Sequence, residues 1–302
     1  MTATIDSDQP QLHFTDAPGV RLAHFEWHAE RRGQGPTVWL VHATGFHGRV
    51  WDQAVRRLPA DRHVIAIEQR CHGRSAPVPF DSWRRFGDDQ VAQIDACGLR
   101  GAIGVGHSMG AHALVQAASR RPGAFRRLIL VDPVMAPPEA YRQPPVPLGQ
   151  LHPAAQRKNR FDSPQAMVER FADRAPYAVF QRDALVDYCT HGLRPADDGN
   201  GWQLCCAPEH EGQVYPIARN MAETYDLVHA LDIPVLVVRA RPMDPAIKPW
   251  DPLGSPTWPG LAAEFRHGRD LPFADKTHFL PMEDPALMAE LIEGEIAALD
   301  KG

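Results

Sequence analysis

The sequence predicts an α/β fold in which a mostly parallel sheet is flanked by helices. Short runs rich in Val, Ile and Leu recur along the 302 residues, and segments with helical patterns separate them. Near-continuous apolar runs are typical of parallel strands covered on both faces. Regular alternation of strand and helix places such strands in one sheet. One long interruption of this rhythm, late in the chain, predicts an inserted second unit.

Six segments are predicted to be strands. Five are short apolar runs, which we expect to be buried in the sheet. The sixth, Arg21–Trp27, alternates apolar and polar residues, and this pattern favours an antiparallel strand at an edge. The five buried strands are expected at Val38–Val41, Val64–Ile67, Ala102–Val105, Leu128–Val131 and Pro234–Val238.

Helical patterns fill the gaps between these strands and close the chain. Asp284 is a suitable N-cap for the last helix, and Pro285 suits its first turn. An apolar stripe at helical spacing then follows, formed by Met288, Leu291, Ile292, Ile296 and Leu299. Earlier helices are expected at Trp51–Leu58, Phe86–Gly98 and Ser108–Arg120.

The rhythm breaks between Pro133 and about Leu231, where prolines and helical pieces replace the strands. We therefore expect residues 134–231 to form a mainly helical cap, inserted between two late strands. Residues 13–133 and 232–302 would form the core, and residues 1–12 a flexible lead-in. In such folds ligands bind at the carboxyl edge of the sheet, and the cap is expected above this edge.

Composition excludes several classes of protein. Hydrophobic residues make up 44% of the chain and charged residues 23%, and the net charge is −5. Arginine pairs are scattered, so no nucleic-acid surface is predicted. No segment approaches the roughly 18 apolar residues that span a membrane. We expect a cytoplasmic protein, and the oligomeric state stays open, with a homodimer as one arrangement.

Cysteine and histidine usage predicts no metal site and no disulfide framework. The five cysteines are odd in number and lack a Cys-x-x-Cys spacing, which fits a reducing compartment. The fifteen histidines include no His-x-x-x-His pair backed by a carboxylate. No metal and no cofactor are therefore expected.

The pentapeptide Gly106-His107-Ser108-Met109-Gly110 is the main candidate for chemistry. It follows an apolar run and precedes an Ala-rich helical run, so Ser108 is expected on a tight turn from strand to helix. Such a turn pushes a serine hydroxyl out of the sheet. Glycine is needed on both sides because a Cβ would clash where strand and helix approach. Ser108 is the predicted nucleophile.

A serine hydroxyl needs a base, and the base needs an orienting carboxylate. His278 is the predicted base, since it lies in a loop just before the terminal helix. Asp244 follows the strand Pro234–Val238 by a short loop and is the favoured acid. Asp132, which ends the strand Leu128–Val131, is the alternative, and Asp251 and Asp275 stay open.

Two backbone N–H groups should stabilise the oxyanion. One is expected from Met109, which follows the nucleophile at a helix N-terminus. The other is expected from Thr44, in the loop after Val38–Val41, where small residues allow a close approach of the backbone to substrate.

The chain resembles enzymes of the α/β-hydrolase fold. Five stretches carry the resemblance in the correct order, and they span nearly all of the chain outside the cap. Departures from the family pattern are Ala43, Glu68, Cys71 and Ala240, none of which removes a catalytic group. The matching stretches are residues 41–46, 68–75, 106–110, 239–244 and 278–285.

The resemblance implies a serine hydrolase that cleaves a carboxylic ester or lactone of a small to medium-sized substrate. Serine at the turn argues against dehalogenases and epoxide hydrolases of this fold, which use aspartate there, and against dienelactone-type enzymes, which use cysteine. Alternatives that stay open are a C–C bond hydrolase, a cofactor-free perhydrolase or acyltransferase, and a non-catalytic ligand receptor.

Substrate contacts are expected at the mouth of the pocket and from cap aromatics. The predicted lining residues are Phe46, His107, Met135 and Phe279. His47 and Arg49 are further candidates, which would meet an anionic group of the substrate.

Overall fold

A sheet of eight strands organises the computed structural model, which describes residues 9–247 and 251–299. The strand order is β1-β2-β4-β3-β5-β6-β10-β11. The strands β4, β3, β5, β6, β10 and β11 run parallel to one another, whereas β1 and β2 are antiparallel to their neighbours. Their bounds are β1 Gln11–Ala17, β2 Val20–Trp27, β3 Val38–Val41, β4 Val64–Ile67, β5 Ala102–His107, β6 Phe125–Val131, β10 Val235–Arg239 and β11 Gly268–Pro272.

Both faces of the central strands are buried because side chains alternate along a strand. In β3, Val38 and Leu40 belong to one hydrophobic core, and Trp39 and Val41 belong to the other. This double burial explains why the sequence shows unbroken apolar runs at these positions. The predicted bounds of β3 and β4 are confirmed, and β5, β6 and β10 extend or shift the prediction by one to three residues.

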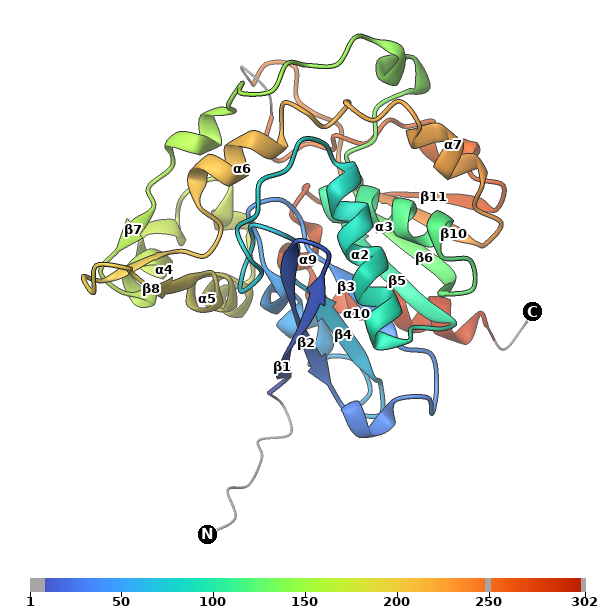
Figure 1. The fold of residues 1–302 in the computed structure, drawn as a ribbon, viewed down its shortest axis with the longest axis horizontal. Helices are drawn as coiled ribbons and strands as arrows, with labels where there is room; N and C mark the ends of the chain where they lie inside the picture. The colour runs from blue at the N-terminus through green and yellow to red at the C-terminus, as the bar shows by residue number, and fades with distance from the viewer. Residues whose placement is uncertain (1–8, 248–250, 300–302) are drawn as a thin grey trace.

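Helices cover the two faces of the sheet (Figure 1). One core contains side chains of α2, α3, α7 and α8, and the other contains side chains of α1 and α10. The predicted cap of the last helix is confirmed, because the Asp284 side chain accepts a hydrogen bond from Leu287 N–H at 3.1 Å. The helices of this part are α1 Asp52–Val55, α2 Arg84–Cys97, α3 Met109–Arg120, α7 Thr224–His229, α8 Leu261–Glu264, α9 Leu280–Glu283 and α10 Pro285–Ala297.

The strand predicted at Arg21–Trp27 is antiparallel as expected, but it does not lie at the edge. β1 pairs with the outer side of β2 from Gln11 to Ala17 and is therefore the edge strand. β1 escaped prediction because its side chains are exposed or half-buried on both faces, so its apolar residues form no clear pattern.

Between β6 and β10 the chain leaves the sheet and forms a separate group of elements to one side (Figure 1). The group has a small antiparallel sheet of order β7-β9-β8. The segment α7 returns to the main sheet and packs beside α3. The division into core and cap stays a prediction, and residues 1–8 of the predicted lead-in lie outside the described residues. The elements of the group are β7 Arg160–Phe161, α4 Pro164–Phe171, α5 Arg182–His191, β8 Leu193–Pro195, β9 Trp202–Leu204 and α6 Pro208–Val214.

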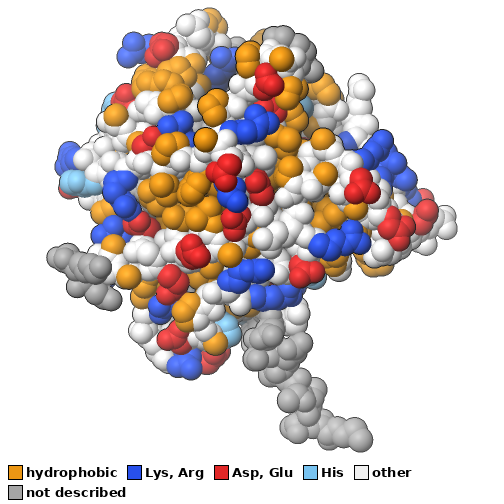
Figure 2. Space-filling model, turned by 180° about the vertical axis from the view of Figure 1, so that it is seen from behind, with side chains coloured by type: hydrophobic (Ala, Val, Ile, Leu, Met, Phe, Trp, Pro, Cys, Tyr) orange, Lys and Arg blue, Asp and Glu red, His pale blue; other side chains and the backbone are white. Residues whose placement is uncertain are grey.

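The surface and the cysteines agree with the composition. Basic and acidic side chains are interspersed over the face seen in Figure 2, without a wide area of one charge. All five cysteines are free thiols. Among the described residues, no helix combines the length and the apolarity that crossing a membrane requires.

Several histidines are buried in the neutral form, and this predicts acid sensitivity. Burial lowers the pKa of His72 to about 4 and the pKa values of His107 and His112 to about 3. An unfolded histidine has a pKa of about 6.5, so the unfolded chain binds more protons below that pH. As the pH falls from 6.5 towards the pKa of the folded protein, each of these histidines lowers the free energy of unfolding by about 1.4 kcal/mol per pH unit. We expect the urea midpoint to be highest above pH 7 and to fall steadily between pH 6.5 and 4.5.

Two variants check the cause. His112→Gln removes one buried imidazole, so its stability should depend less steeply on pH than that of the wild type. His267→Gln removes an exposed imidazole beside Asp232 and should leave the slope unchanged. Burial raises the pKa of Asp187 to about 6, and it also raises the pKa values of Asp52, Glu68 and Asp89, so these carboxylates oppose the trend. The buried histidines with lowered pKa values outnumber them. A midpoint that stays constant from pH 7 to 4.5 would contradict the prediction.

Candidate active site

The carboxyl ends of three strands bring the candidate catalytic residues together. Ser108 follows β5 directly, Asp132 follows the neighbouring strand β6, and His278 lies in the loop between β11 and α9. Parallel strands end at the same edge of a sheet, so residues far apart in sequence meet there. This arrangement explains how residues 108, 132 and 278 come into contact.

Ser108 occupies the sharp turn that the pentapeptide predicts. Its backbone has φ 57° and ψ −120°, a conformation that is strained for a residue with a side chain. A Cβ on Gly106 would lie 2.6 Å from the Cα of Ala111, and one on Gly110 would lie 2.4 Å from the carbonyl oxygen of His42. Both glycines are therefore required by the close approach of β5, α3 and the loop after β3.

His278 contacts both Ser108 and Asp132. Its Nε2 lies 3.1 Å from Ser108 Oγ, and its Nδ1 lies 2.6 Å from Asp132 Oδ2. Because the carboxylate can only accept, Nδ1–H donates to Asp132, and Nε2 is then free to accept the proton of the Ser108 hydroxyl. The backbone also holds the ring in place: His278 N–H donates to Leu253 O, and the ring of His107 donates to the carbonyl oxygen of His278 at 2.8 Å.

Asp132 is buried and strongly bonded in its charged form. Its Oδ1 accepts from Ala240 N–H at 3.1 Å, from Thr257 Oγ1 at 3.2 Å, and from the hydroxyl of Ser255. Burial raises the pKa of Asp132, but the contact with His278 and these donors outweigh it, so the pKa lies below its usual value. A charged Asp132 fixes the tautomer of His278 and stabilises the imidazolium that proton transfer would form.

The structure places Asp132, and not the favoured Asp244, beside His278. Asp244 lies in an exposed loop, where its carboxylate accepts from Ala246 N–H at 2.8 Å. Asp251 is buried but bonds to Arg241 at 2.7 Å and to backbone N–H groups, and Asp275 is exposed. The favoured acid is therefore corrected: the loop after β10 turns away from the imidazole and supplies Ala240 N–H to Asp132 instead.

The loop after β3 is held by two neutral histidines. Gly45 N–H donates to Nε2 of His72 at 3.0 Å, and Gln69 N–H donates to Nε2 of His42 at 3.1 Å. Burial lowers the pKa of both rings, that of His72 to about 4, so both nitrogens remain acceptors at neutral pH. Among the described residues, neither Thr44 N–H nor Met109 N–H donates a hydrogen bond. These two predicted donors are thus available to a ligand.

Three of the four predicted lining residues lie together at the site. The ring of Phe46 lies 6.1 Å from the ring of Phe279 and 6.3 Å from that of His107, and His107 lies 5.0 Å from His278. Met135 does not join them, because its side chain is fully buried in the core with α3 and α7. The backbone of Met135 is held there, because its carbonyl oxygen accepts from Trp258 N–H at 3.0 Å.

Cap aromatics close over the site. The ring of Phe46 lies 5.1 Å from Tyr188 and 6.2 Å from Phe180, both of which come from the segment 177–191. Ser108 itself is buried, with 5% of its surface exposed, so electrostatic contacts at its side chain are stronger than they would be in water.

A buried ion pair, formed by Arg157 and Glu211, contacts the loop after β3. Glu211 bonds to Arg157 at 2.6 Å, and Arg157 bonds to the hydroxyl of Tyr188 at 2.9 Å. A Cβ on Gly45 would lie 2.8 Å from the carboxyl carbon of Glu211. Glu211 and the loop after β3 are therefore in direct contact.

The side chains predicted to contact an anion, and those that could gather around a metal ion, are already bonded to other residues of the protein. His47 bonds to the carbonyl oxygen of Tyr188 at 3.0 Å, and Arg49 bonds to both carboxylate oxygens of Asp52. In the described part of the chain, the one group that could gather around a metal ion is Asp52, Asp187 and His191. The guanidinium of Arg49 already neutralises Asp52, so these residues do not favour a cation.

Comparison with known proteins agrees with this geometry. Residues 40–291 match the model of the Alpha/beta hydrolase family. The chain belongs to this family. Relatives of the chain carry names that include hydrolase, esterase and lipase.

Individual relatives are distant. A 2-(acetamidomethylene)succinate hydrolase of Mesorhizobium japonicum is 30% identical over 133 residues, or 44% of this chain and 46% of that protein. A pimeloyl-[acyl-carrier protein] methyl ester esterase of Nitrosomonas europaea is 30% identical over 34% of this chain and 40% of that protein. The chain thus matches less than half the length of these curated relatives.

Solved structures show the same fold over the whole chain. The crystal structure of an E-2-(acetamidomethylene)succinate hydrolase has a TM-score of 0.72 at 21% identity and covers 95% of this chain and 99% of that one. A structure of Est816, described as an N-acyl homoserine lactone degrading enzyme, has a TM-score of 0.61 at 20% identity, and the match covers 93% of this chain and 99% of that one.

Sequence reasoning missed the residues that support the site. Ser255 and Thr257 hold Asp132, and they lie in a loop without any distinctive spacing. Arg157 and Glu211 are 54 residues apart and meet only in the folded cap. The signal for Asp132 itself was present, since it ends a buried strand next to the strand that carries Ser108.

Substituting Gly45 tests the contact between Glu211 and the loop after β3. Gly45 has φ 78°, and an alanine there would meet the carboxylate of Glu211. Gly19 has φ 76° with nothing within 4 Å of its Cβ position, so Gly19→Ala is a matched control. Left-handed backbone costs an alanine about 1–2 kcal/mol. We expect Gly19→Ala to lose about this amount in urea unfolding and Gly45→Ala to lose clearly more. Equal losses would show that the Glu211 contact carries no stability.

Proposed function

We propose that this protein is a serine hydrolase that cleaves a carboxylic ester or lactone of a small to medium-sized substrate. The chain of contacts from Ser108 through His278 to Asp132 carries the proposal, with hydrogen-bond distances of 3.1 and 2.6 Å. A hydroxyl, an imidazole and a buried carboxylate in this order are the components of nucleophilic acyl transfer. The strained turn under Ser108 supports the same role, since such strain clusters at functional sites.

In the first half of the proposed reaction, Ser108 attacks the carbonyl carbon of the substrate. His278 Nε2 takes the hydroxyl proton, and Asp132 stabilises the imidazolium. The N–H groups of Thr44 and Met109 would bind the oxyanion, with the N-terminus of α3 adding positive potential. His278 then returns the proton to the leaving alcohol, which leaves an acyl group on Ser108.

In the second half, a water molecule replaces the alcohol. His278 removes a proton from the water as it attacks the acyl group, and the tetrahedral intermediate collapses with release of the acid. Ser108 recovers its proton from His278, so the enzyme returns to its starting state. The cycle needs only water, and no cofactor enters it.

The surroundings of Ser108 favour a substrate with an apolar part. The rings of Phe46, Phe180, Tyr188 and Phe279 pack against one another at centroid distances between 5.1 and 6.2 Å, and the ring of Phe279 also lies 5.6 Å from that of His278. The names of the relatives, which include a methyl ester esterase and a lactone degrading enzyme, support an ester or lactone bond.

Replacement of the nucleophile tests the proposal directly. Ser108→Ala removes the attacking oxygen and keeps the same backbone strain, so the fold should persist. We expect turnover of 4-nitrophenyl butyrate to fall by about 10³-fold or more, and fluorophosphonate labelling to disappear. Ser119→Ala, at the far end of α3, should retain both. Full activity in Ser108→Ala would disprove the assignment.

Two aspartate variants identify the orienting carboxylate. Asp132→Asn leaves an amide beside His278 Nδ1 and favours the wrong tautomer, so kcat should fall by about 10³- to 10⁴-fold. Asp244→Asn changes an exposed loop and should leave kcat within about twofold, as is usual for surface substitutions. Steady-state kinetics with 4-nitrophenyl butyrate provides the measurement. The opposite order of effects would restore Asp244 as the acid.

A further inference from the structure

Two buried histidine rings are bonded to the loop that carries Thr44, and the proposed reaction does not use either of them. His42 and His72 are both fully buried, and their ring centroids lie 5.2 Å apart. His42 follows β3 directly, and His72 lies in the segment after β4. Because β3 and β4 are neighbouring parallel strands, both rings lie at the same carboxyl edge of the sheet.

Each ring can form its observed bonds in only one protonation state. The Nδ1 atom of His42 lies 2.7 Å from Ala43 O, and the Nδ1 atom of His72 lies 2.8 Å from Arg70 O. A carbonyl oxygen can only accept, so both Nδ1 atoms carry a proton. Both Nε2 atoms accept a hydrogen bond from a backbone N–H group, so neither carries one. Both rings are therefore neutral Nδ1–H tautomers.

The bond from His42 orients the peptide group between Ala43 and Thr44. In a planar trans peptide, the carbonyl oxygen and the N–H group point in opposite directions. The carbonyl oxygen of Ala43 accepts from His42 Nδ1–H and also from Phe46 N–H at 3.2 Å. The N–H of Thr44 therefore points away from the His42 ring, and it donates to no residue that the structure describes.

The bond to His72 fixes the next peptide group, between Thr44 and Gly45. Residues 43–46 form a hydrogen-bonded turn, and its third residue, Gly45, has φ 78°. Such a positive φ is typical of a type II turn, which differs from a type I turn by a flip of the central peptide group. This flip would turn Gly45 N–H away from His72 Nε2, so the ring favours the observed turn. Both peptide groups that flank Thr44 are thus bonded to a histidine.

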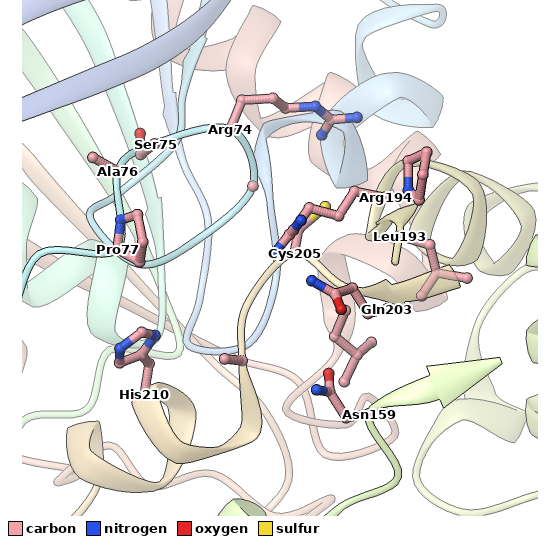
Figure 3. A pocket seen from close by; sticks show the side chains of 14 residues that line it. Arg74, Ser75, Ala76, Pro77, Asn159, Leu193, Arg194, Gln203, Cys205 and His210 are labelled. Carbon is pink, nitrogen blue, oxygen red and sulfur yellow. The ribbon is translucent and has the colours of Figure 1, made fainter. Parts of the chain in front are cut away.

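The segment that carries His72 is held by a buried carboxylate. The backbone N–H and the guanidinium of Arg74 donate to Glu68 at 2.5 and 3.1 Å. Residues 74–77 form a loop that faces Arg194 of β8 across a crevice (Figure 3). The position of His72 therefore depends on the bonds to Glu68 rather than on packing across this crevice.

We infer that His42 and His72 are positioning residues, which fix the two peptide groups around Thr44 and so direct its N–H at the oxyanion. The inference rests on the proposed hydrolase function. All four ring nitrogens are bonded to backbone groups, so neither ring serves as an acid or a base. The oxyanion forms only after Ser108 attacks, so correct aim of this N–H stabilises the transition state and not the bound substrate. The rings should therefore affect kcat and not KM.

Four amide variants test the inference. An asparagine amide can replace the Nδ1 atom of a histidine, and a glutamine amide can replace the Nε2 atom. At position 42 the aim of Thr44 N–H needs the donor to Ala43 O, which His42→Asn keeps and His42→Gln loses. At position 72 it needs the acceptor for Gly45 N–H, which His72→Gln keeps and His72→Asn loses. The effective substitution is thus the opposite one at the two positions.

Steady-state kinetics with 4-nitrophenyl butyrate provides the measurement. His42→Gln and His72→Asn should each lower kcat by about 10²-fold, as expected for a misplaced oxyanion donor, and leave KM unchanged. His42→Asn and His72→Gln should lower kcat by less than about tenfold, the effect of one weakened neutral hydrogen bond.

His63→Gln is the matched control. His63 is also buried, but it bonds to Thr37 and Glu26, and Thr37 precedes the amino end of β3. This variant should lower the urea midpoint about as much as the other four and leave kcat unchanged. Equal kcat in the two variants at position 42 or in the two at position 72, or a change in KM instead of kcat, would overturn the inference.

Heteronuclear NMR of the imidazole nitrogens separates failure of this inference from failure of the proposed function. Long-range nitrogen–proton spectra of the full-length wild type at pH 7 show which ring nitrogen carries the proton. His42→Asn and His72→Gln assign the two rings, because each variant loses one set of signals. A proton on Nδ1 alone in both rings supports the inference even if no ester is hydrolysed. A proton on Nε2 of either ring refutes it even if esters are hydrolysed.

Discussion

The hydrogen bond between His278 and the buried carboxylate of Asp132 is the contact on which the candidate site depends. A charged carboxylate that is removed from water must be compensated by donors, or it takes up a proton instead. Here Ala240 N–H, Ser255 and Thr257 supply the donors, and all three come from the chain after β10. The loop that was expected to carry the acid therefore has a different task, which is to keep the acid at the end of β6 charged.

Strain is concentrated in the same place. Ser108 and Asp132 end neighbouring strands, and both have positive φ values, 57° and 45°, although neither is glycine. The surrounding backbone holds them there: Ser108 N–H donates to Val131 O at 3.0 Å, and Asp132 N–H donates to Val238 O at 2.7 Å. The rigid sheet thus maintains two unfavourable turns, and their side chains face a common imidazole as a result.

The cap adds two environments of different polarity. Next to the loop after β3 it contributes aromatic rings and the buried pair of Arg157 and Glu211. Further out it contributes Arg194 and His210 to an open, basic crevice. Tyr188 contacts both Phe46 and His47 and so joins this group of elements to the loop after β3. A movement of the cap would therefore also displace the loop that carries Thr44.

The sequence alone determined the fold class, the strands β3 and β4, the turn at Ser108 and the candidate base His278. These follow from local patterns, because a buried parallel strand needs an apolar run and a tight turn from strand to helix needs small residues around its serine. Only the tertiary structure decided that Asp132 rather than Asp244 meets His278, that Met135 turns into the core, and that Arg74 and Arg194 face one crevice. In each case the deciding quantity is the path of a loop in space. Loop paths depend on long-range packing and on where buried polar groups find partners, and spacing along the chain contains neither.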